Sequence, residues 1–167
     1  MIPKRAKSAV STAIVALLMS STTPATAAEV TKTALFNASP DQVWALIGEF
    51  SAIGDWHPAV QKVDMSGDAQ SGMFRTLHLP DGATLKEKLL ARSNAEMHYS
   101  YSIVSTGVLP VSNYVSTIRV WRARQPGQTV VQWSSTFGAV AVTEPEAQAV
   151  MSGIYAAGFD GIREKLK

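Results

Sequence analysis

The chain has 167 residues, no cysteine and a formal net charge of +2 at pH 7. The absence of cysteine excludes disulfides, thiolate metal sites and cysteine nucleophiles. Residues 1–27 carry three Lys or Arg side chains and no acidic one, so the rest of the chain has 12 basic against 13 acidic residues, a net charge of −1. Composition therefore provides no argument for a nucleic-acid or anionic-membrane partner, and we expect no nucleic-acid binding.

The first segment, residues 1–27, has the pattern of a cleaved secretory signal peptide. Three basic residues precede an apolar run over residues 9–19, and small residues then lead to Ala27. We expect cleavage after Ala27 and a periplasmic or secreted protein. The apolar run is too short to span a bilayer and no later segment is long enough, so no transmembrane segment is expected in the mature chain. Residues 28–167 are expected to form a single domain.

The mature chain begins with a predicted strand followed by a short helical segment. Residues 30–37 have β character. Ser39 and Gln42 are spaced as a capping box, and Pro40 suits the first position of a helix. Apolar residues then recur at helical spacing, and Gly54 marks the approach to the end of this region.

Turn residues recur about every ten positions through the middle of the chain, which is typical of successive strands. Strands are predicted at residues 60–66, 72–79, 83–92, 97–104, 113–123 and 129–139. Thr143 and Glu146 form a second capping box, and apolar residues follow at three- and four-residue steps to Leu166. Short connections favour antiparallel neighbours, and only this last helix is long enough to cover the sheet. The sequence predicts an α+β fold in which a curved seven-stranded antiparallel sheet wraps around a long C-terminal helix.

One predicted hairpin carries two charges on its apolar face. If Pro80-Asp81-Gly82 is a three-residue loop, Arg75 lies directly opposite Glu87. Strand alternation then places both charges on the face that carries the leucines. Burying two charges costs several kcal/mol per ion, so stability alone is a poor reason for the pair. Two interpretations stay open: an internal ion pair, or a ligand site in which Arg75 holds an oxygen atom and Glu87 acts as a general base.

Aromatic side chains are predicted on or near the same face. Tyr99, Tyr101, Tyr114 and Trp133 form either a plain core or the wall of a pocket for a flat aromatic ligand. The histidines His57, His78 and His98 are interpreted as scattered surface residues. The sequence has no metal-ligand spacing and no phosphate-binding glycine loop, so we expect no metal and no cofactor.

The order of elements resembles the helix-grip fold of the START-like (SRPBCC) and pollen-allergen superfamily, in particular its polyketide cyclase/dehydrase branch. The resemblance covers nearly all of residues 30–167. It rests on Ser39 to Trp44, Asp55 to Pro58, Ser71 to Arg75, Glu87 to Leu89, Tyr99 to Tyr101, Leu109 to Val111, Tyr114 and Trp133. It implies a cavity between the sheet and the C-terminal helix. The segments beginning at Trp56 and Leu109 would rim its entrance as gate and latch, or would simply be stiffened by proline.

The first functional interpretation is an exported protein that binds a small hydrophobic or aromatic, polyketide-like molecule in this cavity. The candidate ligand-binding residues are Arg75, Glu87, Tyr99, Tyr101, Tyr114, Trp133, Trp56, His57, Leu109, Phe137 and Tyr155. A similarity to lachrymatory factor synthase implies instead a cyclase, dehydratase or isomerase, with Glu87 as general base and Arg75 as oxyanion anchor. A similarity to the MxaD type of periplasmic accessory protein, linked to methanol oxidation, implies a non-enzyme with a periplasmic protein partner.

Overall fold

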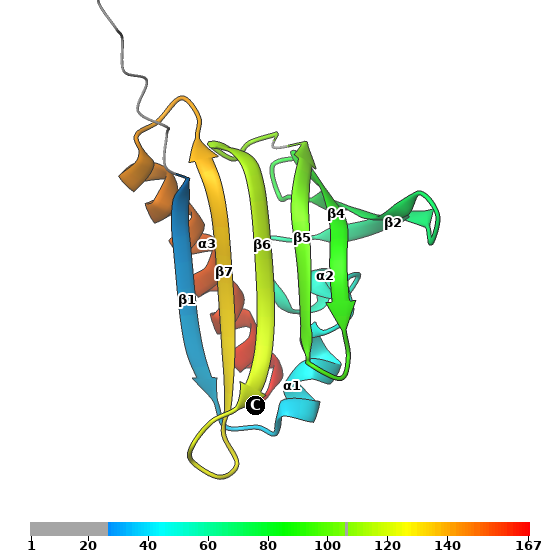
Figure 1. Cartoon of the computed structure of the whole chain (residues 1–167), viewed down its shortest axis with the longest axis vertical. Helices are drawn as coiled ribbons and strands as arrows, with labels where there is room; N and C mark the ends of the chain where they lie inside the picture. The colour runs from blue at the N-terminus through cyan, green and yellow to red at the C-terminus, as the bar shows by residue number, and fades with distance from the viewer. Residues whose placement is uncertain (1–26, 106) are drawn as a thin grey trace, which may run out of the picture.

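The computed structural model describes residues 27–105 and 107–167. The predicted signal peptide, apart from Ala27, lies outside this part of the chain. The elements in chain order are β1 (Ala28–Phe36), α1 (Pro40–Ile47), α2 (Ile53–Trp56), β2 (Lys62–Asp68), β3 (Gly72–His78), β4 (Thr84–Ser93), β5 (His98–Ser105), β6 (Val111–Arg122), β7 (Thr129–Ala139) and α3 (Glu144–Lys165). Of these, α3 crosses one face of the sheet (Figure 1).

The seven strands form one antiparallel sheet in the order β1-β7-β6-β5-β4-β3-β2. From β2 to β7 each strand pairs with the next one along the chain, and β1 closes the order by pairing with β7. The sheet twists so strongly that β2 runs nearly crosswise to β1 (Figure 1). This curvature produces the concave face that α3 occupies, and the predicted helix-grip fold is confirmed.

The helical region after β1 consists of two short helices where the sequence predicted a single segment. The Ser39 capping box forms as expected, because Ser39 Oγ accepts from the Gln42 N–H and the Gln42 side chain accepts from the Ser39 N–H. Gly48 ends α1 with a 2.7 Å hydrogen bond from its N–H to the Trp44 carbonyl oxygen. A Cβ atom at Gly48 would lie 2.5 Å from the Trp44 ring, so this tight end requires glycine and separates α1 from α2.

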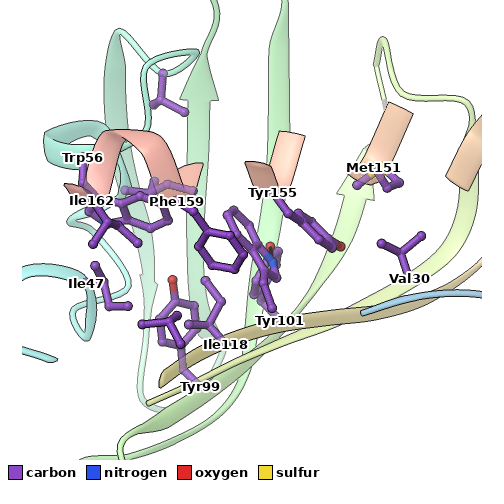
Figure 2. Close-up of a cluster of buried hydrophobic side chains, with 14 of the residues drawn as sticks. Val30, Ile47, Trp56, Tyr99, Tyr101, Ile118, Met151, Tyr155, Phe159 and Ile162 are labelled. Atoms are coloured by element: carbon purple, nitrogen blue, oxygen red, sulfur yellow. Dashed lines mark hydrogen bonds between the residues drawn. The ribbon is translucent and has the colours of Figure 1, made fainter. Parts of the chain in front are cut away.

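Helix α3 packs closely on both the sheet and α2 because small residues lie at the contact. A Cβ at Gly158 would lie 2.7 Å from the Trp133 ring, and one at Gly161 would lie 1.9 Å from the Trp56 carbonyl oxygen. Around these glycines, large side chains of α3 such as Tyr155 and Phe159 project into the core (Figure 2). No helix in the described residues is long and apolar enough to cross a membrane.

The β3–β4 hairpin has the predicted register. The N–H of Leu79 donates to the Ala83 carbonyl oxygen at 2.9 Å, and Gly82 has the positive φ of +81° that the loop requires. Arg75 is paired with Glu87 across the two strands. Both charged side chains therefore point toward the concave face, as the alternation predicted.

Candidate functional site

A cavity of about 210 Å³ lies between the concave face of the sheet, α2 and α3. We refer to the residues around it as the cavity wall: Ile53, His57, Ala59, Val60, Leu77, Leu79, Leu85, Glu87, Tyr101, Ile103, Leu109, Tyr114, Trp133, Met151, Ile154 and Tyr155. Most of these side chains are aliphatic or aromatic, and Glu87 is the one carboxylate among them. The chemistry of the cavity is therefore that of an apolar pocket with a few polar groups.

Seven of the candidate residues predicted from the sequence belong to the cavity wall: His57, Glu87, Tyr101, Leu109, Tyr114, Trp133 and Tyr155. The other four, Arg75, Tyr99, Trp56 and Phe137, are buried but lie outside the wall. Trp56 packs edge-on against Trp133 with ring centroids 5.7 Å apart, and Phe137 stacks on Tyr114 at 6.2 Å. Both side chains therefore support wall residues from behind.

Apart from Leu109, the aliphatic residues of the wall were not among the candidates predicted from the sequence. Leu77 and Leu85 share a face with the two charges of the hairpin, so strand alternation contained the signal for them. Met151 and Ile154 precede Tyr155 on α3 at helical spacing, which places them on the same helix face. Val60 and Ala59 come from the connection after α2, and no periodic pattern pointed to them.

Arg75 and Glu87 form a buried ion pair. The Nε atom of Arg75 lies 2.5 Å from Oε2 of Glu87, and the two residues are 0% and 3% exposed. Arg75 also donates from Nη1 to the Phe50 carbonyl oxygen at 2.7 Å. Its guanidinium carbon lies 4.1 Å from the centroid of the Phe50 ring and 5.0 Å from that of Tyr101. The guanidinium is thus enclosed by a carboxylate, a backbone carbonyl and aromatic rings.

Of the two charged residues in this pair, Glu87 is the one that belongs to the cavity wall. Burial raises the pKa of the Glu87 carboxyl, and the attraction of Arg75 opposes this rise without cancelling it. Burial is the largest single effect on Arg75 and penalises its charged form, but Glu87 together with Tyr99 and Tyr101 outweighs it. The pKa of Arg75 is therefore raised, and the guanidinium stays charged. Within the described residues, Oε2 of Glu87 is hydrogen-bonded and Oε1 has no hydrogen-bond partner.

Two buried polar atoms next to this pair have no hydrogen-bond partner among the described residues: Nη2 of Arg75 and the hydroxyl of Tyr99. The two side chains are close, because the Arg75 guanidinium carbon lies 6.0 Å from the centroid of the Tyr99 ring. Both residues lie outside the cavity wall. Neither atom therefore adds a polar group to the cavity.

His57 is buried, which corrects its interpretation as a surface histidine. Its Nε2–H donates to the Ile154 carbonyl oxygen at 3.1 Å, and its Nδ1 accepts from the Ala59 N–H at 3.2 Å. Burial lowers the pKa of His57, so the ring is neutral at neutral pH and carries its proton on Nε2. The close approach of α3 at Gly158 covers this ring, and sequence alternation could not reveal that contact.

Neither ring nitrogen of His57 has a lone pair left for a metal ion. Its Nδ1 lone pair accepts a backbone hydrogen bond and its Nε2 carries the proton. His78 is half-buried and bonds to the exposed carboxylate of Asp64 at 2.7 Å. In the described part of the chain, no three His, Cys, Asp or Glu side chains are grouped to hold a metal ion.

Aromatic residues on β5, β6, β7 and α3 form a stacked and hydrogen-bonded cluster at the cavity. The rings of Trp133 and Tyr155 are stacked, with centroids 4.4 Å apart and an interplanar angle of 14°. The indole N–H of Trp133 lies 3.1 Å from the Tyr101 hydroxyl and 3.0 Å from Ser116 Oγ. Burial raises the pKa of Tyr101 and of Tyr114 well above the usual tyrosine value. These hydroxyls therefore stay protonated and can act as hydrogen-bond donors.

Several solved structures have the same architecture as this chain. The protein XoxI from Bacillus cereus is 34% identical with a TM-score of 0.77, over 83% of this chain and 95% of that one. An uncharacterised protein from Bacillus thuringiensis is also 34% identical with a TM-score of 0.76, over 83% and 98% of the two chains. The Zhui aromatase/cyclase from a Streptomyces species shares the fold at 18% identity, with a TM-score of 0.69 over 84% and 94%.

No curated protein matches the sequence significantly. The family model described as "Polyketide cyclase / dehydrase and lipid transport" matches residues 27–167, which includes the whole chain after the predicted signal peptide. This match agrees with the seven-stranded sheet, the long C-terminal helix and the internal cavity. The chain therefore belongs to the polyketide cyclase/dehydrase and lipid transport family of helix-grip proteins.

Proposed function

We propose that this protein binds a compact hydrophobic or aromatic molecule in the cavity between the sheet and α3. The observation that carries this proposal is the cavity itself, at about 210 Å³ with a largely apolar wall. For comparison, an apolar cavity of about 150 Å³ engineered into another protein stays dry and binds benzene. The volume here favours a molecule with one or two rings. The rings of Trp133, Tyr155 and Tyr101, which belong to the cavity wall, provide aromatic contacts for such a ligand.

The predicted signal peptide supports an exported protein that meets its ligand in the periplasm or outside the cell. The family description names both cyclase and transport activities, and binding of a hydrophobic molecule is common to both. A carrier needs only the cavity. A periplasmic protein partner, as in accessory proteins of dehydrogenase systems, stays a prediction from sequence resemblance.

The proposal is tested by native mass spectrometry of the protein purified under mild conditions from its own host. The expected result is a species heavier than the mature chain by the mass of one small molecule, which denaturing conditions release. The mass of the mature chain in the same experiment reports whether cleavage follows Ala27. An empty protein that also fails to bind naphthalene-sized molecules when titrated would contradict the proposal.

A second candidate function is proton-transfer catalysis on the bound molecule. It is favoured by Glu87, whose raised pKa and free Oε1 atom at the cavity wall suit a general base. Arg75 is less suited to the oxyanion-anchor role, because its Nε and Nη1 already bond to Glu87 and Phe50 and it lies outside the wall. Once a substrate is found, unchanged turnover in Glu87→Gln would contradict this mechanism.

A further inference from the structure

Most polar groups of the cavity wall already have their hydrogen bonds satisfied by the protein. His57 uses both ring nitrogens, one as donor to Ile154 and one as acceptor from Ala59. The single indole proton of Trp133 is directed at the oxygens of Tyr101 and Ser116. A ligand in the cavity therefore finds no free hydrogen-bonding atom on either ring.

The hydroxyl protons of Tyr114 and Tyr155 are also committed. Tyr155 donates to Ser135 Oγ at 2.6 Å. The Tyr114 and Tyr155 hydroxyl oxygens lie 2.6 Å apart. Because a phenol has a single proton and that of Tyr155 is given to Ser135, Tyr114 must donate to Tyr155. Neither tyrosine has a proton left for a ligand.

Among the side chains of the wall, one charged acceptor and one hydroxyl proton take part in no hydrogen bond within the described residues. The first is Oε1 of Glu87, an acceptor whose partner oxygen Oε2 holds Arg75. The second is the hydroxyl proton of Tyr101, since the Tyr101 oxygen accepts from Trp133 and no hydrogen bond among the described residues uses its proton. Tyr101 pairs with Leu89, two residues along β4 from Glu87, so the two groups are diagonal neighbours on the same face of the sheet.

We propose that the ligand carries a hydroxyl group, phenolic, enolic or alcoholic, which donates to Oε1 of Glu87 and accepts from the hydroxyl of Tyr101. This inference rests on the proposed function, because it assigns the polar group of the molecule held in the cavity. A hydroxyl supplies one donor and an acceptor on a single atom, which matches the two free positions. An ether or ketone oxygen only accepts, so it would leave the Glu87 oxygen without a partner.

The same arrangement disfavours carboxylic acids as ligands at neutral pH. A ligand carboxylate has no proton to donate and would face the negative Oε1 of Glu87 in an apolar surrounding, where like charges repel strongly. The positive charge of Arg75 does not reverse this effect, because its guanidinium lies behind Glu87, outside the wall. The structure therefore favours neutral hydroxylated rings over fatty-acid-like or aromatic acids.

The experiment uses three probes that differ in one substituent: 2-naphthol, 2-methoxynaphthalene and 2-naphthoate. Each is titrated at neutral pH into the mature protein, and the dissociation constant is measured by NMR. We expect 2-naphthol to bind about tenfold or more tightly than 2-methoxynaphthalene, because hydrogen bonds to charged groups contribute more than neutral ones. We expect 2-naphthoate to bind more weakly than both neutral probes.

Tyr101→Phe tests the donor without disturbing the fold, because the Trp133 N–H keeps Ser116 as acceptor. The variant is expected to lose several-fold of the preference for 2-naphthol over 2-methoxynaphthalene. Tyr99→Phe is the matched control: it removes a buried hydroxyl from the same strand, at a residue outside the wall, and should keep the wild-type preference. Glu87→Gln should improve 2-naphthoate binding, because it removes the negative charge from the cavity wall. This variant leaves Arg75 unpaired. If it fails to fold, the comparison of Tyr101→Phe with Tyr99→Phe decides the hydroxyl assignment.

The outcomes separate this inference from the proposed function. Equal affinity for 2-naphthol and 2-methoxynaphthalene would overturn the hydroxyl assignment and leave binding of hydrophobic molecules in the cavity standing. Tight binding of 2-naphthoate, or an unchanged preference in Tyr101→Phe, would also overturn it. If none of the three probes bound, this inference would be overturned, and a protein that also purified without a bound molecule would overturn the proposed function as well.

Discussion

Nε of Arg75 lies 2.5 Å from Oε2 of Glu87, and both side chains are buried beside the cavity. The pair joins β3 to β4 at directly opposed positions, and Nη1 of Arg75 extends the connection to the backbone of Phe50. Arg75 therefore holds the carboxylate in place at the cavity wall. Its removal would leave a buried negative charge without compensation.

We predict that Arg75→Met lowers the free energy of unfolding by about 3–5 kcal/mol, the usual cost of leaving one partner of a buried pair unpaired. The double variant Arg75→Met with Glu87→Leu should recover most of this loss, since it removes both charges. Urea denaturation followed by tryptophan fluorescence measures both effects. A single variant as stable as wild type would show that the pair is not the buried ion pair described above.

Replacement of Arg75 should also change how stability depends on pH. Without Arg75 the pKa of Glu87 lies further above its ordinary value of 4.5, because burial is no longer opposed. A carboxyl whose pKa is raised on folding stabilises the folded state below its unfolded pKa, and this contribution is lost as pH rises through the folded value. We expect Arg75→Met to lose stability relative to wild type as pH rises above 4.5. A parallel pH profile for the two proteins would contradict this.

Because of His57, we predict that the stability of the wild-type protein has the opposite pH dependence below neutral pH. Burial lowers its pKa below the ordinary value of 6.5, so the unfolded chain takes up a proton before the folded one does. The free energy of unfolding should therefore fall as pH decreases from 6.5 toward the lowered value. In His57→Gln, part of this slope should disappear, as measured by urea denaturation across the pH range. An identical slope in the variant would show that His57 does not titrate in this way.

Two glycines of α3 offer a matched test of the helix packing. A Cβ at Gly158 would lie 2.7 Å from the Trp133 ring and 3.0 Å from that of His57. Gly158→Ala should therefore destabilise the protein by about 1–3 kcal/mol through overpacking. Gly153→Ala meets nothing within 4 Å and should stabilise α3 by up to about 1 kcal/mol through helix propensity. Thermal unfolding of the two variants checks the contrast, and equal destabilisation would contradict the close approach of α3.

Neighbouring residues of the β5–β6 connection test where a ligand binds. Leu109 belongs to the cavity wall, whereas Val108 is 53% exposed and lies outside it. Leu109→Trp should reduce the affinity for 2-naphthol about tenfold or more, because one indole takes up much of a pocket of this size. Val108→Trp should leave that affinity unchanged. NMR titration of both variants provides the measurement, and similar affinities would place the ligand elsewhere.

Local sequence patterns determined the strands, the starts of α1 and α3 and the inward direction of the hairpin charges. Capping residues such as Ser39 act within one helical turn, and the loop at Gly82 sets the register of the strands that it joins. Alternation along a strand then decides which face carries Arg75 and Glu87. These features depend on residues that are close together in the sequence, so they can be inferred from one amino-acid sequence alone.

Only the tertiary structure decided which of these inward residues line the cavity and which polar atoms are free. Trp56 and Phe137 face inward as predicted, yet they pack behind Trp133 and Tyr114. The hydrogen bonds that occupy His57 come from α3 and from the connection after α2. The contact with Ile154 joins segments far apart in sequence, and its geometry depends on how closely α3 approaches the sheet. Within the part of the chain that the structure describes, the free oxygen of Glu87 and the free proton of Tyr101 follow from that packing, and no local pattern encodes them.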